Sequence, residues 1–151
     1  EGTIRSNSYE LEIAHQAADI VVTGQACPLW AAIVEANEAD SEGADYFVRQ
    51  RIKELLGRDP DIDTLVLACT HYPLLLNTIK KHVPSDIRIV SQGEYVAESL
   101  AQYFQRHPDM ESRITRGGSC RYLTTENPDR FTECARIFLR EPIVAKNVTL
   151  G

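Results

Sequence analysis

The sequence predicts an α/β fold, a parallel sheet flanked by helices, for three reasons. Short apolar segments of strand length alternate along the 151 residues with segments of helical period. The connections between them are short, which suits parallel strands joined by right-handed helical crossovers. The composition, 43% hydrophobic and 25% charged, is ordinary for a globular chain long enough for about one domain with its own core.

The first part of the chain predicts a helix, a strand and a second helix. Asn7 with Glu10 three residues later is typical of a helix start, so we expect a helix over about residues 8–18. Residues 19–23 are rich in β-branched side chains and are followed by a glycine, which favours a strand. A helix is then expected over about residues 28–37, because a proline opens this segment.

The middle of the chain gives the clearest signals. The apolar side chains of residues 47–56 fall on one stripe of a helix, which we expect to end at Gly57. Residues 65–68 form a short apolar run without polar alternation, as in a buried parallel strand. A helix over about residues 74–81 and a strand over residues 87–90 follow.

The last part predicts two more helices and two more strands. We expect helices over about residues 93–105 and from residue 127 onward, and strands over residues 120–124 and 148–150. On the first of these helices Val96, Leu100 and Phe104 are expected to face inward. Residues 106–118 are polar and contain a glycine pair, so we expect them to be the least ordered.

The best candidate for a functional site lies directly after the strand at residues 65–68. Cys69, Thr70 and His71 follow this strand, and Pro73 then opens the next helix. The carboxyl ends of strands are where open α/β sheets bind ligands. A thiol before a helix and near an imidazole can be held as a thiolate and can exchange protons. A free cysteine is more often an inert buried thiol, but the polar residues after Cys69 favour the reactive interpretation.

The overall charge and the cysteine pattern exclude several classes. The net charge is −6, which argues against a nucleic-acid-binding face. We see no signal peptide and no apolar run near the ~20 residues that a membrane span needs. The four cysteines form no Cys-x-x-Cys pair, so we expect reduced thiols and no metal site. We therefore expect a cytoplasmic protein with no nucleic-acid or membrane partner.

Three stretches resemble one family. Residues 68–75, Ala-Cys-Thr-His-Tyr-Pro-Leu-Leu, resemble the second active-site motif of the glutamate racemases, which belong to the cofactor-independent amino-acid racemase superfamily. Residues 26–30, Ala-Cys-Pro-Leu-Trp, followed by Val34 and Glu35, resemble the helix opening of the same family. The segment Gly2-Thr3, with Ser6 and Tyr9, resembles the start of this half of the enzyme.

The resemblance implies a role for five residues, and it implies a reaction that needs no cofactor. Cys69 would be one of two bases, acting on the L-enantiomer, with a pKa that proteins can tune from ~8.5 toward neutrality. His71 would assist the thiol, and Glu35 would orient or polarise His71. Thr70 would bind a substrate carboxylate through its hydroxyl and backbone N–H, and Thr3 would contact the substrate from a loop.

Each assignment has a simpler alternative. Glu35 also fits a solvated helix residue, and Thr3 also fits a loop residue without a role. Cys27 lies outside the catalytic pair that the resemblance implies, so we expect it to be structural. The remaining cysteines, Cys120 and Cys134, are expected to pack in the interior. The remaining histidines are expected at the surface; they are His15, His82 and His107.

The resemblance also implies a domain organisation. Residues 1–91 would form the second α/β domain of the racemase fold, with one catalytic cysteine, and residues 92–151 would complete the first domain. Because residue 1 is Glu and Thr3 already lies inside a motif, we expect a fragment without the amino-terminal portion that holds the other catalytic cysteine. Residues 92–151 would then expose apolar surface.

The implied function is that of an isomerase, a glutamate racemase. It would interconvert L- and D-glutamate by two-base proton transfer at the α-carbon and supply D-glutamate for peptidoglycan. The full-length protein is expected to be a homodimer, and this chain alone is expected to be inactive. Two alternatives stay open: a racemase of another acidic amino acid such as aspartate, and a non-catalytic α/β binding domain.

Overall fold

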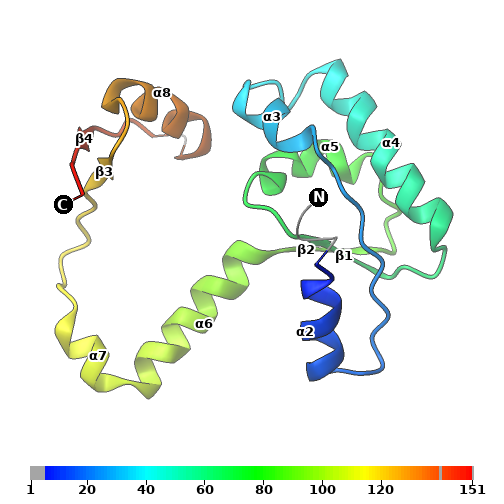
Figure 1. Cartoon of the computed structure of the whole chain (residues 1–151), viewed down its shortest axis with the longest axis horizontal. Coiled ribbons are helices and arrows are strands. Elements are labelled where there is room, and N and C mark those ends of the chain that lie inside the picture. Colours follow the sequence, from blue (N-terminus) through cyan, green and yellow to red (C-terminus); the bar gives the residue numbers. More distant parts are fainter. Residues whose placement is uncertain (1–5, 140, 151) are drawn as a thin grey trace. The chain divides into compact units, whose positions relative to one another are not determined.

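A computed structural model describes residues 6–139 and 141–150, and it divides the chain into two compact units, Glu1–Gln92 and Gly93–Gly151. Each unit has one pair of parallel strands with helices beside it, as Figure 1 shows. The predicted α/β class with parallel strands is therefore confirmed. None of the helices in the described residues combines the length and apolar character that a membrane span requires.

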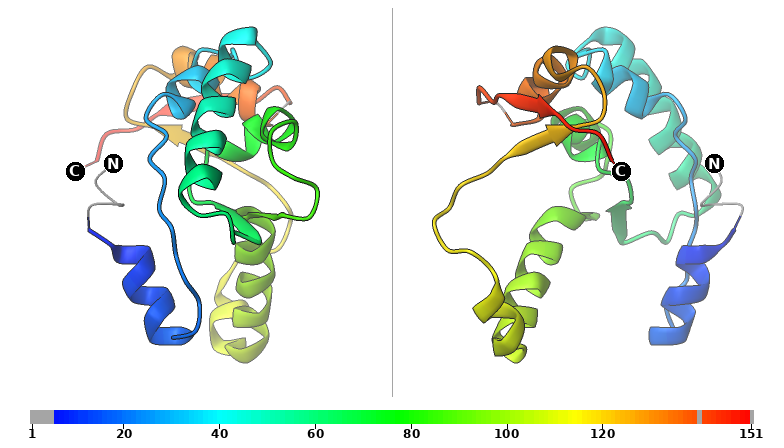
Figure 2. Two further views of the ribbon diagram at one scale, coloured as in Figure 1. Left: turned by 90° about the vertical axis from the view of Figure 1, so that its right-hand side faces the viewer. Right: turned by 60° about the vertical axis from the view of Figure 1, so that its left-hand side comes forward.

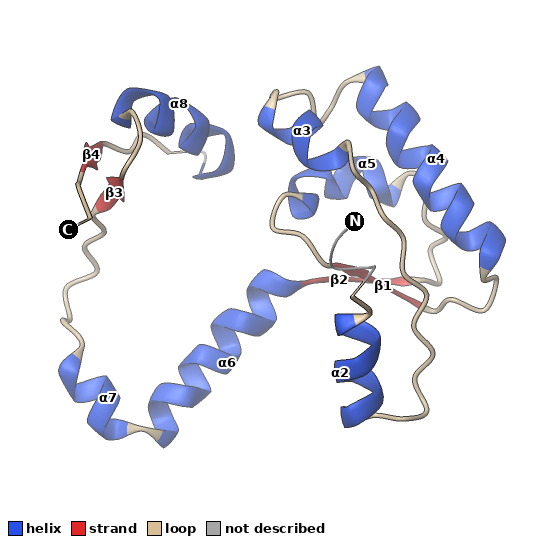
Figure 3. Cartoon of the chain, viewed as in Figure 1, coloured by secondary structure: helices blue, strands red, loops and turns tan. Residues whose placement is uncertain are grey.

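The first unit is built on strands β1 and β2. Its elements are α2 (Ser8–Gln16), α3 (Trp30–Glu35), α4 (Glu42–Arg58), β1 (Thr64–Leu67), the 3₁₀ helix η1 (Tyr72–Leu75), α5 (Leu76–Lys80) and β2 (Arg88–Ser91). The two strands pair in parallel from Thr64 opposite Arg88 to Leu67 opposite Ser91. Figure 3 shows α3, α4 and α5 on one side of this strand pair and α2 on the other.

The core of the first unit lies between β1 and the helices α3, α4 and α5. The apolar stripe predicted for α4 is buried at Val48 and Ile52, and Ser41 caps this helix by accepting a hydrogen bond from the Ala44 N–H at 3.1 Å. Leu75 and Ile79 are fully buried against it. Each such aliphatic side chain contributes roughly 1.5–3 kcal/mol by leaving water. This core fixes the segment between β1 and α5, where the candidate site lies.

The predicted strand at residues 19–23 does not form. These residues run as irregular backbone, seen in Figure 2 as the long blue connection after α2. No strand in the described part of the chain pairs with them, and Val21 is 85% exposed. Hydrogen bonds with residues at the end of α4 hold this part of the chain instead. The Thr23 hydroxyl donates to the Asp59 carboxylate at 2.6 Å, and Arg58 donates to the Gly24 carbonyl at 3.0 Å.

The second unit is smaller. It contains α6 (Gln92–Arg106, whose first residue closes the first unit), α7 (Pro108–Arg113), β3 (Tyr122–Thr124), α8 (Pro128–Leu139) and β4 (Ala145–Asn147). β3 and β4 pair in parallel from Tyr122 opposite Ala145 to Thr124 opposite Asn147. Asn127 caps α8, because its side-chain oxygen accepts the backbone N–H groups of Asp129 and Arg130.

Four predictions for the second unit are wrong. The last strand lies at residues 145–147 and not at 148–150. Its partner β3 has three residues, and the pairing of the two strands ends at Asn147. Part of the segment 106–118 is the helix α7, which begins at a proline. Two of the three side chains of α6 that were expected to face inward are exposed, Val96 at 63% and Leu100 at 52%, while Phe104 is half-buried. Cys120 and Cys134, which were expected to pack inside, are also exposed.

Candidate functional site

The candidate site lies at the carboxyl end of β1. After Leu67 the chain turns through Cys69, Thr70 and His71 and enters η1. The Tyr72 N–H donates to the Cys69 carbonyl at 3.2 Å, and the Leu74 N–H donates to the His71 carbonyl at 3.0 Å. The turn is tight because it is closed by these local hydrogen bonds and by the proline of η1. A 3₁₀ turn thus precedes α5, where the sequence predicted one continuous helix.

Three of the predicted site residues meet at this turn. The Nε2 of His71 lies 3.1 Å from a carboxylate oxygen of Glu35, the last residue of α3. The Nδ1 of the same ring lies 3.8 Å from the Cys69 sulfur. The carboxylate, imidazole and thiol therefore form a continuous chain of contacts, although Glu35 is 36 residues before His71 in sequence.

The fourth residue, Thr70, contacts the same ring nitrogen. Its hydroxyl oxygen lies 3.5 Å from His71 Nδ1, and the residue is exposed. It is thus placed where an incoming ligand could meet its hydroxyl. The fifth residue, Thr3, lies outside the described residues, so its predicted role stays a prediction.

The contacts allow one direction of proton movement. When the Nε2–H of His71 donates to Glu35, the lone pair of Nδ1 faces the Cys69 thiol and can accept its proton. The separation of 3.8 Å is within the reach of a hydrogen bond to sulfur. The side chain of His71 is 25% exposed and that of Glu35 is 63% exposed. The site is therefore open to solvent on the Glu35 side in this chain.

Cys27 has a different environment from Cys69. Burial raises the pKa of the Cys27 thiol to about 12, and the nearby Arg51 only partly offsets this. The thiol donates weakly to the Gln25 carbonyl at 3.8 Å. A thiol that stays protonated at neutral pH is a poor nucleophile and a poor base. Cys27 therefore fits the structural role that the sequence predicted for it.

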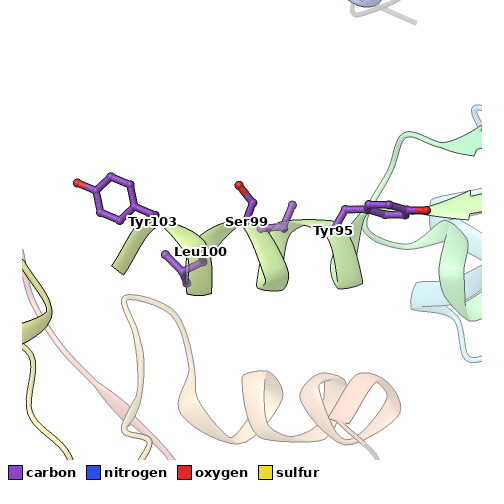
Figure 4. A pocket seen from close by; sticks show the side chains of 5 residues that line it. Tyr95, Ser99, Leu100 and Tyr103 are labelled. Atoms are coloured by element: carbon purple, nitrogen blue, oxygen red, sulfur yellow. The ribbon is translucent and has the colours of Figure 1, made fainter. Parts of the chain in front are cut away.

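Other polar groups lie away from this site. His82 was expected at the surface, but its Nε2 lies 2.8 Å from the Asp45 carboxylate and its side chain is only 18% exposed. Within the described residues, no three His, Cys, Asp or Glu side chains are grouped so that they could hold a metal ion. A shallow apolar hollow lies along α6, lined by Tyr95, Val96, Ser99, Leu100 and Tyr103 (Figure 4). It contains none of the predicted site residues.

Two aromatic residues beside the site had no predicted role. The Tyr72 hydroxyl donates to the Cys27 carbonyl at 3.2 Å, and the Tyr72 ring meets the ring of Trp30 edge-on at 4.9 Å. Both residues belong to the stretches that resemble the racemase motifs. Their contact joins two segments far apart in sequence, and no local pattern in either segment signals it.

Comparison with known proteins identifies relatives of the whole chain. No family model matches it. A glutamate racemase of Ruegeria sp. strain TM1040 is 36% identical over 142 residues, which are 93% of this chain and 50% of that protein. A glutamate racemase of Lactiplantibacillus plantarum is 34% identical over 152 residues, covering all of this chain and 55% of that protein.

The solved structures agree with the sequence matches. A glutamate racemase isoform of Bacillus anthracis superposes with a TM-score of 0.84 at 32% identity, over 99% of this chain and 55% of that one. A Francisella tularensis glutamate racemase in complex with D-glutamate shares the fold, with a TM-score of 0.80 at 24% identity. The chain spans about half the length of the curated relatives that it matches. Over that length, this chain is similar in sequence and in fold to the glutamate racemases.

Proposed function

We propose that this chain supplies one of the two bases of a glutamate racemase, and that Cys69 is that base. The observation that carries the proposal is the contact chain from Glu35 through His71 to Cys69 at the carboxyl end of β1. The 34–37% identity to glutamate racemases supports the same reaction. A non-catalytic binding domain would not need an imidazole between a carboxylate and a thiol.

The reaction follows from the chemistry of these groups. His71 takes the thiol proton at Nδ1 and leaves a thiolate on Cys69, while Glu35 stabilises the imidazolium at Nε2. The thiolate then takes the α-proton of L-glutamate, and the electron pair of the broken C–H bond stays on the α-carbon. A donor on the opposite face of that carbon returns a proton and gives D-glutamate. In the reverse direction the Cys69 thiol donates the proton, so charge and protons balance.

Two further roles complete the proposal. Thr70 binds a substrate carboxylate, which its exposed position beside His71 supports. Thr3 contacts the substrate; this rests on the sequence motif alone. The Francisella tularensis protein was solved with D-glutamate, which supports L- and D-glutamate as the substrates of the enzyme that contains this chain. Its product would supply peptidoglycan synthesis in the cytoplasm.

We also propose the domain roles that the sequence suggested. Residues 1–91 act as the second α/β domain, and residues 92–151 complete the first one. Support comes from the exposed apolar side chains of α6 and α8, among them Tyr95, Leu100 and Phe131, because helices with a bare apolar face need a covering surface. The complete enzyme is proposed to be a homodimer.

Substrate comparison tests the proposed function. The complete gene product, without added metal or pyridoxal cofactor, is incubated separately with L-glutamate and L-aspartate, and the loss of optical activity is followed by circular dichroism. We expect inversion of glutamate at a rate typical of enzymes, ~1–10³ s⁻¹. Inversion of aspartate alone would mean that the substrate is aspartate and not glutamate. Inversion of neither amino acid would favour the alternative of a non-catalytic binding domain.

A further inference from the structure

We propose that Tyr72 is a positioning residue, which ties the first turn of α3 to the segment after β1 and so fixes the contact between Glu35 and His71. The inference rests on the proposed function, because it concerns the same three-residue chain. Its evidence is the geometry around α3, which the sequence motifs do not show.

The two ends of α3 are held by two consecutive residues. At the start of the helix, the Tyr72 ring meets Trp30 edge-on with centroids 4.9 Å apart, and the Tyr72 hydroxyl donates to the Cys27 carbonyl just before the helix. At the end of the helix, Glu35 contacts His71 at 3.1 Å. α3 is therefore attached to the motif segment at both ends.

The attachment at Tyr72 is the stronger of the two. Trp30 is 3% exposed, whereas the Glu35 side chain is 63% exposed, and an ion pair in water contributes little on its own. An edge-to-face aromatic contact in the core adds to the burial that both rings already gain. The Trp30 indole N–H has no hydrogen-bond partner among the described atoms, so packing determines its place.

The short length of α3 makes this attachment important. A helix of six residues has too few internal hydrogen bonds to keep its place alone. Trp30 and Val34 are one turn apart and both buried, so the angle of the helix follows from how Trp30 is seated. Glu35 comes directly after Val34. A small tilt of α3 would therefore move the carboxylate away from the imidazole.

The Tyr72 hydroxyl is suited to a permanent contact. Burial, with smaller contributions from the charges of Cys27 and Cys69, raises the pKa of Tyr72 to about 12. The hydroxyl therefore stays protonated at neutral pH and donates to the Cys27 carbonyl.

The test reads the tautomer of His71 in this chain by ¹⁵N NMR of the ring nitrogens. In the wild type we expect Nε2–H to predominate, because Glu35 accepts that proton. Glu35→Ala is the reference for a lost hydrogen-bond acceptor at Nε2. Tyr72→Phe removes one hydroxyl and keeps the ring, and we expect it to give a mixture of tautomers close to that reference. Tyr46→Phe is the matched control, because its hydroxyl accepts from Gln50 on the exposed face of α4.

Kinetic measurements on the complete gene product distinguish a loss of positioning from a general loss of stability. Tyr72→Phe is expected to lower kcat about 10-fold with KM unchanged, less than the ~10²–10⁴-fold expected for loss of a proton-transfer group. Far-UV circular dichroism checks folding, and if Tyr72→Phe is unfolded, Trp30→Phe tests the second contact of Tyr72 with this region, the edge-on contact of the two rings.

Two results would overturn the inference. One is a wild-type tautomer in Tyr72→Phe when Glu35→Ala changes the tautomer, and the other is a lower kcat of Tyr72→Phe without any change of tautomer. Failure of the proposed function would look different. In that case the tautomer would respond to Tyr72→Phe, but the complete gene product would not racemise glutamate.

Discussion

At the scale of single residues, the surroundings of the four thiols differ enough to rank them. Cys27 is protonated at neutral pH because burial raises its pKa to about 12. Cys69 is half-buried and has the imidazole of His71 as a proton acceptor at 3.8 Å. Cys120 and Cys134 are exposed. Since the thiolate is the reactive form, access alone does not decide reactivity.

We predict that Cys69 is the thiol alkylated fastest at neutral pH and that Cys27 is the slowest. Limited treatment of the chain with iodoacetamide, followed by peptide mass spectrometry, gives the four rates. His71→Asn should slow the alkylation of Cys69 and leave that of Cys120 and Cys134 unchanged, because the His71 imidazole lies 3.8 Å from the Cys69 sulfur. Preferential labelling of either exposed thiol in the wild type would contradict the assignment.

The second prediction at this scale concerns the imidazole. In the complete gene product, His71→Asn should reduce the racemisation rate about 10²–10⁴-fold, because the thiol loses its proton acceptor but not its own reactivity. The thermal midpoint should change little, since His71 lies outside the buried core. The matched control is His15→Asn, at an exposed histidine of α2, and it should keep the full rate. An unchanged rate in His71→Asn would exclude its role.

At the scale of elements, the sequence correctly predicted the helices and strands whose pattern lies within one segment of the chain. The stripe of α4, the apolar run of β1 and the proline after His71 each lie within one segment, and each element formed. The strands expected at residues 19–23 and 148–150 did not form, because a strand exists only through its partner and the pairing is set elsewhere in the chain.

The contacts of the candidate site also divide into local ones, which the sequence pattern predicts, and distant ones, which it does not predict by itself. Cys69, Thr70 and His71 are adjacent in sequence, so their meeting at a strand end could be predicted from the pattern. The contact of Glu35 with His71 was expected only from a family resemblance, since 36 residues separate them. The contact of Tyr72 with Trp30 depends on how α3 seats against η1. Neither segment alone contains that information.

An ion pair between elements gives the prediction at this scale. A hydrogen bond from His82 holds the pKa of Asp45 below its ordinary value of 3.8, so the pair links the start of α4 to the end of α5. A carboxyl whose folded-state pKa is depressed stabilises the fold above that ordinary value. The stabilisation is lost as the pH falls through the lower folded-state pKa.

Asp45→Asn should therefore lower the urea midpoint at pH 6, and the difference from the wild type should shrink as the pH falls below 3.8. Urea unfolding followed by far-UV circular dichroism across this range checks it. Asp86→Asn, at an exposed position, is the control and should have little effect. A difference that stays constant down to the lowest pH would mean that the pair does not titrate with folding.

At the scale of the whole molecule, the chain holds one candidate base and spans about half of the racemases that it matches. A two-base reaction needs a donor on the opposite face of the α-carbon. Cys27 is unsuited, because burial raises the pKa of its thiol to about 12 and so makes it a weak proton donor. Cys120 and Cys134 are exposed in a unit where solvent reaches the thiols freely. Solvent exclusion and a positioned donor are both needed for efficient inversion.

We therefore predict that this chain alone does not racemise glutamate at an enzymatic rate. L-Glutamate incubated with the purified chain should keep its circular dichroism signal while the complete gene product abolishes it. Slow exchange of the α-proton with solvent deuterium is compatible with one base. A turnover near ~1–10³ s⁻¹ by this chain would place the second base within these residues.

The central claim is that Cys69 is a base of the racemase, and removing its sulfur tests that claim most directly. Racemisation of L-glutamate by the complete gene product is measured by circular dichroism for the wild type, for Cys69→Ala and for Cys120→Ala. The last variant removes an exposed thiol that has no proposed role. We predict that Cys69→Ala abolishes racemisation although it stays folded, and that Cys120→Ala keeps the wild-type rate. Turnover of Cys69→Ala at the wild-type rate would contradict the account.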